Sequence, residues 1–178
     1  MVRKNVVTNL ILPENLEDQV VMNQRRFIDN NNGTITDSIT GLMWQEGYAY
    51  RDTGNYITWY DANDYIKKLN QQKLGGFADW RLPSKLEIQS LYEIARPFKS
   101  RGKTFTLHID PMFEFSYGSC FWTNRTRLSA ALGFEFDVGD IHWYPQGSVS
   151  GTVRATRLNN DSLMFINVSW ANRAIEGF

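Results

Sequence analysis

One stretch, residues 75–87, constrains the fold of this chain more than any other, because it fixes how a helix must begin. Two glycines are followed by Asp-Trp-Arg and then by Leu-Pro-Ser-x-x-Glu. Ser84 and Glu87 have the spacing of a capping box, in which each side chain satisfies a free backbone N–H at the helix start. The stretch therefore predicts a turn that carries Trp80 and Arg81 into a core at the start of a helix.

The size and charge of the chain exclude several classes of function. A chain of 178 residues favours one domain with room for a sizeable core. Its 19 basic and 19 acidic residues cancel, so no overall field attracts anionic partners, and we expect no nucleic-acid partner. Cys120 is the sole cysteine, which excludes an intrachain disulfide and a cysteine-based zinc site. We expect it to be a small buried residue, and we expect no cofactor.

The apolar residues are too dispersed for a membrane span. No run approaches the roughly 20 apolar residues that a spanning helix needs, so we expect a protein that does not span the membrane. Residues 1–13 have a basic flank but interrupted hydrophobicity, which matches a secretion signal poorly. Two alternatives stay open: the protein remains inside the cell, or a signal has been removed from a secreted form.

Short runs of β-branched and aromatic residues predict strands in the first quarter of the chain. Residues 26–28 and 34–36 flank an Asx-rich loop that contains a glycine, which indicates a hairpin. Residues 42–45 are expected to form another short strand. After residue 104 the sequence again favours short strands and loops, punctuated by glycines.

Two helices are predicted between these regions. Residues 58–70 begin at a capping threonine and repeat apolar side chains at helical spacing, which predicts a buried stripe of Ala62, Tyr65, Ile66 and Leu69. A second helix is expected from Lys85 to about Ala95, stopped by Pro97. Two helices enclosed by β structure indicate an α+β fold rather than alternating strands and helices. We expect residues 1–25 to be an extended N-terminal segment and residues 26–178 to be a single domain.

Seven stretches between residues 26 and 157 follow one another in the order of one known pattern. Residues 37–44 resemble the Asp-x-x-Thr-Gly-Leu-x-Trp signature of the Lcl C-terminal domain family, which is named after the C-terminal domain of a bacterial collagen-like adhesin. The other stretches are residues 26–37, 59–62, 76–84, 109–113, 121–124 and 153–157. The structural motif positions are Asp37, Thr40, Gly41, Trp44, Gly76, Asp79, Trp80, Arg81, Pro83, Ser84 and Glu87.

The resemblance implies a fold and a class of function. The Trp-Arg-Leu-Pro-Ser-x-x-Glu core is also similar to that of formylglycine-generating and related sulfatase-modifying domains. This implies a C-type-lectin-like domain with two helices, short and mostly antiparallel strands, and long loops that carry the binding face. The chain departs from those enzymes because it lacks a cysteine pair, and it lacks the Glu-Pro-Asn and Trp-Asn-Asp triplets of calcium-dependent lectins. The family's name-giving member implies adhesion to sulfated glycans at a bacterial surface.

Two histidine–aspartate pairs raise a metal hypothesis. They are His108-Ile-Asp110 and Asp140-Ile-His142. Positions i and i+2 of a strand share a face, so four such groups could together hold a metal. The alternative, which we favour, is a set of polar residues on solvated strand edges, and we assign no metal site.

The sequence offers few candidates for catalysis. No nucleophile elbow or glycine-rich phosphate loop occurs, so we expect a protein without catalytic residues, although a triad assembled by folding stays an alternative. Asp79 and Arg81 flank Trp80, and we interpret Arg81 as a buried arginine paired with a carboxylate rather than as an anion contact. We expect Arg154 and Arg157 to face opposite ways, so that at most one lies on any given surface.

Cations without neighbouring acids mark the candidate binding residues. Residues 96–103, which we interpret as a loop, contain four cations, no acid and a central Phe98. A solvated loop is the alternative, yet a basic loop on a binding scaffold suits an anionic ligand. We predict that sulfate or carboxylate groups of a polysaccharide contact Arg96, Lys99, Arg101 and Lys103, together with Arg125 and Arg127.

The favoured function is therefore a non-catalytic ligand-binding domain of a bacterial surface or secreted protein. Its expected partner is an anionic polysaccharide or another cell-surface ligand, and its expected location is extracellular or at the cell surface. A protein-binding or structural module of a surface assembly, including a homo-oligomer, is the first alternative. A metal-dependent or sulfatase-modifying-like enzyme is the second.

Overall fold

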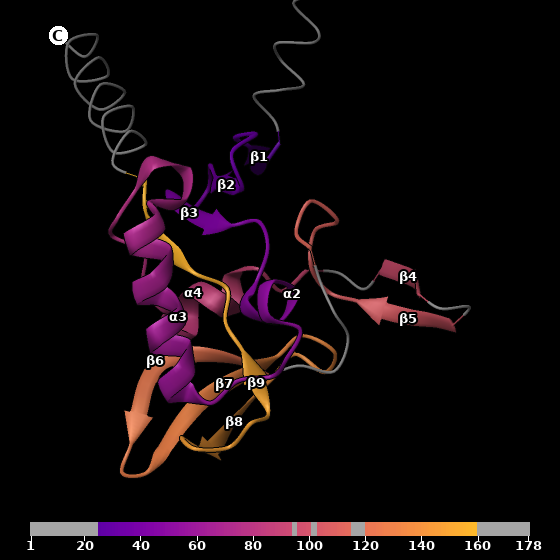
Figure 1. Ribbon diagram of the computed structural model, residues 1–178. Coiled ribbons are helices and arrows are strands. Elements are labelled where there is room, and N and C mark those ends of the chain that lie inside the picture. Colours follow the sequence, from indigo (N-terminus) through magenta and orange to yellow (C-terminus); the bar gives the residue numbers. More distant parts are fainter. Residues whose placement is uncertain (1–24, 94–95, 101–102, 115–119, 160–178) are drawn as a thin grey trace, which may run out of the picture.

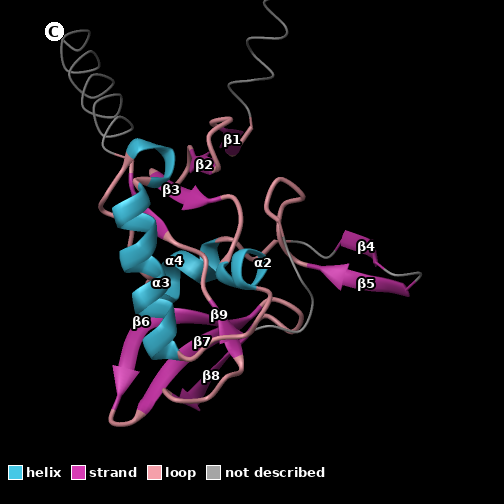
Figure 2. Ribbon diagram, in the orientation of Figure 1, coloured by secondary structure: helices cyan, strands magenta, loops and turns pink. Residues whose placement is uncertain are grey.

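A computed structural model describes residues 25–93, 96–100, 103–114 and 120–159 of the chain, and its strands form three sheets (Figure 1). One sheet has the strand order β1-β2-β3-β10, a second consists of β4 and β5, and the third has the order β8-β7-β6-β9. In the view of Figure 2 the helices lie between the sheet that contains β1–β3 and the sheet that contains β6–β8.

The first sheet confirms the predicted hairpin and the strand that follows it. It contains β1 (Phe27–Asp29), β2 (Thr34–Asp37), β3 (Leu42–Gln45) and β10 (Thr156–Leu158), all paired antiparallel. Gly33 adopts a φ of 80° at the end of the Asx-rich loop, a conformation that glycine adopts at little cost. The last strand of the described chain thus pairs with one of the first.

The longest helix of the described residues, α3 (Trp59–Gln72), confirms the predicted start and the predicted stripe. Thr58 and Asp61 form a capping box at its N-terminus, and the predicted residues Ala62, Tyr65, Ile66 and Leu69 are its buried ones. A 3-10 turn, η1 (Leu74–Gly76), follows it. The sequence did not predict the short helix α2 (Ala49–Thr53), since five residues are too few to show a helical period.

The second predicted helix is shorter than expected. Helix α4 spans Lys85–Ser90 and begins with the predicted capping box of Ser84 and Glu87. The chain then leaves the helical path, because the backbone N–H of Glu93 donates to the carbonyl of His108, 2.7 Å away. The prediction that Pro97 ends this helix is wrong, since Pro97 lies within a strand.

The third sheet contains the longest strands. Its members are β6 (Cys120–Arg127), β7 (Ala130–Glu135), β8 (Asp140–Pro145) and β9 (Gly151–Thr152). Strands β6, β7 and β8 pair antiparallel, whereas β9 pairs parallel with β6. The prediction of an α+β fold with short, mostly antiparallel strands is confirmed.

Two clusters of buried side chains lie on opposite faces of the same strands. Leu42 and Trp44 of β3 join one cluster, with Phe121 of β6, while Met43 and Trp122 join the other. Alternate residues of a strand point to opposite faces, so β3 and the first half of β6 are covered on both sides. Trp44, Trp80 and Trp122 are buried, which confirms the core position predicted for Trp80. We call the cluster that contains Phe121 the α4-side core, because Ile88 of α4 belongs to it.

Residues 96–100 and 103–107 form two paired strands, which corrects the prediction of a loop over residues 96–103. Strand β4 (Arg96–Ser100) pairs antiparallel with β5 (Lys103–Leu107), from Arg96 opposite Leu107 to Ser100 opposite Lys103. The β4–β5 pair projects away from the other described strands in Figure 1. The alternation in Lys-Thr-Phe-Thr-Leu is typical of a strand, and it outweighs the loop signal of the neighbouring cations.

In the described part of the chain, no helix is both long and apolar enough to cross a membrane.

Candidate functional site

The Asp-x-x-Thr-Gly motif is a turn held by a buried carboxylate. Asp37 accepts two hydrogen bonds from Arg26, at 3.1 and 2.8 Å, and one from the backbone N–H of Ile39 at 3.0 Å. Burial alone would raise the pKa of Asp37, but the hydrogen bonds from Arg26 and Thr40 hold it below its usual value. Gly41 takes a φ of 68° and closes the turn. These residues shape the fold.

The glycine-rich motif docks onto the last described strand. The carboxylate of Asp79 accepts from Nε of Arg157 at 2.6 Å, and the Arg157 guanidinium carbon lies 3.8 Å from the centre of the Phe77 ring. The hydrogen bond from Arg157 is the main reason that the pKa of Asp79 lies below its usual value. Arg157 thereby connects two of the motif stretches, residues 76–84 and residues 153–157.

Trp80 is fixed by backbone and amide contacts on both sides. Its indole N–H donates to the carbonyl of Leu74 at 3.0 Å. The side chain of Asn70, at the end of α3, donates to the Trp80 carbonyl and accepts from the Trp80 N–H. The buried indole therefore joins α3 to the turn that leads into α4.

Arg81 pairs with Glu87, as the structural interpretation of this arginine requires. Two hydrogen bonds of 2.8 and 2.7 Å join its guanidinium to both carboxylate oxygens of Glu87, which also accepts from the backbone N–H of Ser84. Burial would raise the pKa of Glu87, but the hydrogen bonds from Arg81 and Ser84 lower it. The side chain of Arg81 remains partly exposed rather than fully buried.

Neither Arg154 nor Arg157 lies on the surface. Arg154 is fully buried and donates to the backbone carbonyls of Gln45, Glu46 and Glu114, and its guanidinium carbon lies 4.9 Å from the centre of the Phe113 ring. Burial lowers the pKa of Arg154 to about 9. Both arginines of the last motif are thus structural.

The two histidines lie in different surroundings. Asp140 lies 3.4 Å from His142 on β8, and both side chains are largely exposed. Nδ1 of His108 lies 3.0 Å from the carbonyl of Glu93, and its ring stacks on Tyr92. No group of three or more metal-ligating side chains occurs among the residues that the structure describes.

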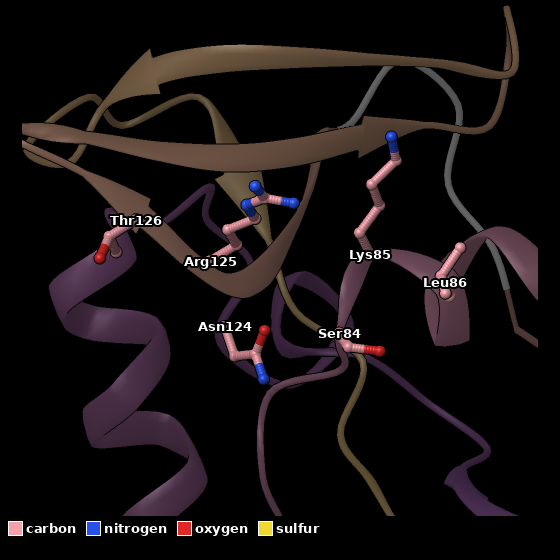
Figure 3. A pocket seen from close by; sticks show the side chains of 6 residues that line it. All are labelled: Ser84, Lys85, Leu86, Asn124, Arg125 and Thr126. Carbon is pink, nitrogen blue, oxygen red and sulfur yellow. The ribbon is translucent and has the colours of Figure 1, made fainter.

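A pocket of about 700 Å³ opens between the start of α4 and the outer half of β6. Its lining residues carry two cations and no carboxylate, and they are Ser84, Lys85, Leu86, Asn124, Arg125 and Thr126. In Figure 3, Asn124 and Arg125 extend from the strand while Lys85 rises from the helix start. Neither cation forms an ion pair with any described residue.

An irregularity in β6 builds one wall of this pocket. Trp122 pairs with Gly133 and Thr126 with Ala131, so three residues of β6 stand opposite the single residue Leu132. Such a bulge bends a strand and redirects its side chains. Hydrogen bonds hold it: the Asn124 N–H donates to the Pro83 carbonyl at 2.9 Å, and the Thr123 hydroxyl donates to the Leu132 carbonyl at 2.9 Å. The bulge therefore presents Arg125 beside the Leu-Pro-Ser segment.

The structure separates the cations that the sequence grouped together. Arg125 lines the pocket, and the Arg127 guanidinium carbon lies 5.1 Å from the centre of the Trp143 ring. Arg96 and Lys99 lie on β4 and Lys103 on β5, on the opposite side of the molecule from β6 in Figure 1. Arg101 falls outside the described residues. The sequence did not predict that Lys85 and Asn124 line a site, because α4 and β6 are brought together only by the fold.

A family model described as the Lcl C-terminal domain matches residues 33–157. The chain belongs to this family. The match covers the turn at Asp37, the glycine-rich motif, the pocket and Arg157, so the pocket of this Lcl C-terminal domain lies within the matched residues, whereas the core residue Phe27 precedes them. No curated protein and no solved structure shows a significant match.

Proposed function

We propose that this Lcl C-terminal domain is a non-catalytic binding module that recognises an anionic polysaccharide at the surface of a bacterial cell or outside it. The observation that carries the proposal is the pocket between α4 and β6, where no carboxylate is among the described residues that line it beside Lys85 and Arg125. A concave site with unpaired cations favours a ligand that brings its own negative charge.

The chemistry of the lining suits sulfate or carboxylate groups on sugars. Arg125 offers a planar fork that can donate two parallel hydrogen bonds to such an oxyanion, and Lys85 adds a compact positive charge. The amide of Asn124, which makes no side-chain hydrogen bond to a described residue, can donate to a sugar hydroxyl or accept from it. The pocket thus offers charge and neutral hydrogen bonding together.

In this proposal a second cationic region comprises Arg96 and Lys99 of β4 and Lys103 of β5, together with Arg101, which lies outside the described residues. Because β4–β5 projects on the side away from β6 in Figure 1, the proposal assigns the pocket alone to a short fragment. A long polysaccharide can contact both regions, and simultaneous contacts raise the apparent affinity without any new kind of interaction. Each exposed contact is worth about 0.5 to 1 kcal/mol, so short fragments are expected to bind weakly.

Two residues that could take part in catalysis, Cys120 and Arg81, have other engagements in this chain. The thiol of Cys120 is buried, and burial raises its pKa, which keeps it protonated and poorly nucleophilic. Arg81, which could contact an anionic group, pairs with Glu87. These contacts support a binding module rather than an enzyme.

The proposal is tested by measuring binding to immobilised heparin and to neutral dextran at low and at physiological salt. We expect retention on heparin alone, weakening as salt rises because exposed charges are screened. Equal retention on both matrices, or none on heparin, contradicts the proposal. A glycan array and light scattering together separate this function from a structural one. A structural module is expected to bind no glycan on the array and to form a stable oligomer in solution.

A further inference from the structure

Beyond the pocket, the sheet that carries Arg125 presents an exposed indole. Trp143 lies on β8, and 36% of its surface is open to solvent, whereas Trp44, Trp80 and Trp122 are at most 2% exposed. A tryptophan left on a surface exposes a large apolar ring to water. The position of Trp143 in the sheet determines which groups its ring can contact.

Trp143 lies on the same face of the sheet as the pocket. It pairs with Leu132, while its neighbour two residues back, Ile141, pairs with Phe134 of the α4-side core. Residues two apart on a strand, and residues directly opposite on paired strands, share a face. Trp143 therefore lies on the face that α4 covers, beyond the part that the helix reaches.

Arg127 connects the indole to the pocket. Its guanidinium carbon lies 5.1 Å from the centre of the Trp143 ring, which is a cation–π distance, and this contact restrains both side chains. Arg125, two residues earlier on β6, lines the pocket. Cations and an aromatic ring thus follow one another across a single face.

We infer that Trp143 and Arg127 form a second subsite, in which the indole stacks against a sugar ring of the polysaccharide whose charged group occupies the pocket. This inference rests on the proposed function. The ligand class is an anionic polysaccharide whose sugars expose an apolar C–H face, because such a face packs on an aromatic ring while its hydroxyls remain in water. Arg127 then contacts a neighbouring anionic substituent.

The apolar contact of Trp143 and the charged contact of Lys85 should respond differently to salt. Trp143→Ala removes an apolar contact, so it should weaken binding of heparin fragments about three- to tenfold at low and at physiological salt alike. Lys85→Ala removes a charge, so its effect should shrink as salt screens that charge. Trp143→Phe keeps a ring and should retain part of the affinity. Tyr60→Ala, which removes an exposed aromatic ring from α3, is the matched control and should bind as the parent does.

The experiment is a titration of the full chain with size-graded heparin fragments, monitored by calorimetry at two salt concentrations, with melting temperatures recorded for each variant. Parent-like binding by Trp143→Ala, together with loss in Lys85→Ala, overturns the subsite and leaves the proposed function standing. If the parent itself does not bind heparin, the proposed function and the subsite both fail. A loss in Trp143→Ala that shrinks with salt as the Lys85→Ala loss does also overturns stacking.

Discussion

Asp79 accepts hydrogen bonds from Nε and Nη2 of Arg157, at 2.6 and 3.2 Å, and so joins the turn before α4 to the strand β10. The arginine is nearly buried at 5% exposure, whereas the aspartate side chain is 57% exposed. The carboxylate of Asp79 is therefore the charged partner of a guanidinium that is buried in the core. Removing it leaves that cation without its charged partner.

Asp79→Ala is expected to lower the free energy of unfolding by about 1 to 3 kcal/mol, because it strands a buried guanidinium. Asp64→Ala is the matched control, since Asp64 pairs with Lys67 at 2.7 Å while both side chains stay about 70% exposed. That change should cost about 0.5 kcal/mol or less. Denaturant unfolding of the two variants measures the difference, and equal losses would contradict the structural role of Asp79.

Asp37 is expected to make the folded chain less stable at acidic pH. Its pKa is lowered in the folded chain, so its contribution is present above the unfolded pKa of about 3.9 and is lost as the pH falls through the folded value. Asp37→Asn should cost about 1.5 to 3 kcal/mol at neutral pH and should flatten the decline of stability below about pH 4. Melting temperatures between neutral and acid pH check this. An unchanged acid profile in the variant means that other carboxylates cause the decline.

Gly133 is expected to tolerate no side chain. A Cβ atom there would lie 2.0 Å from the Cys120 sulfur, so Gly133→Ala should destabilise the chain by about 1 to 3 kcal/mol through overpacking. Removing the sulfur in the double variant Gly133→Ala, Cys120→Ala makes room for the new methyl group. Denaturant unfolding should therefore show that the double variant loses less than the sum of the single losses. Strict additivity would show that the two sites do not share this space.

The cations of residues 96–103 are expected to contribute to the affinity for long ligands alone. Replacing Lys99, Arg101 and Lys103 by Ala should weaken binding of full-length heparin but leave binding of short fragments unchanged, because a short fragment occupies the pocket without reaching β4–β5. Surface plasmon resonance with both ligands measures this. Equal loss with short and long ligands would place these cations in the primary site.

Local signals in the sequence predicted the parts of the fold that depend on neighbouring residues. The capping boxes at Thr58 and Ser84 and the stripe from Ala62 to Leu69 follow from residues three or four positions apart, and the structure contains both features. The end of α4 was not predictable in this way. It depends on the hydrogen bond from Glu93 to His108, a residue that lies 15 positions later in the sequence.

The pocket was only half predictable for the same reason. Arg125 stood out as a cation without a neighbouring acid, but its partner Lys85 lies on another element, 40 residues earlier in the chain. The bulge that aims Arg125 at α4 arises from a mismatch in pairing between β6 and β7. No pattern within either strand reveals such a mismatch, because it is a property of the pair.

The most direct test of the proposed function is the affinity of the variant Lys85→Ala, Arg125→Ala for short heparin fragments, measured by calorimetry at low salt. Its control, Lys68→Ala, Arg25→Ala, removes the same charge from exposed positions outside the pocket lining. We predict that the pocket variant loses about 5- to 30-fold in affinity, for about 1 to 2 kcal/mol, with an unchanged melting temperature, while the control binds nearly as the parent does. Equal losses in the two variants would show that net charge alone governs binding and would contradict a site between α4 and β6.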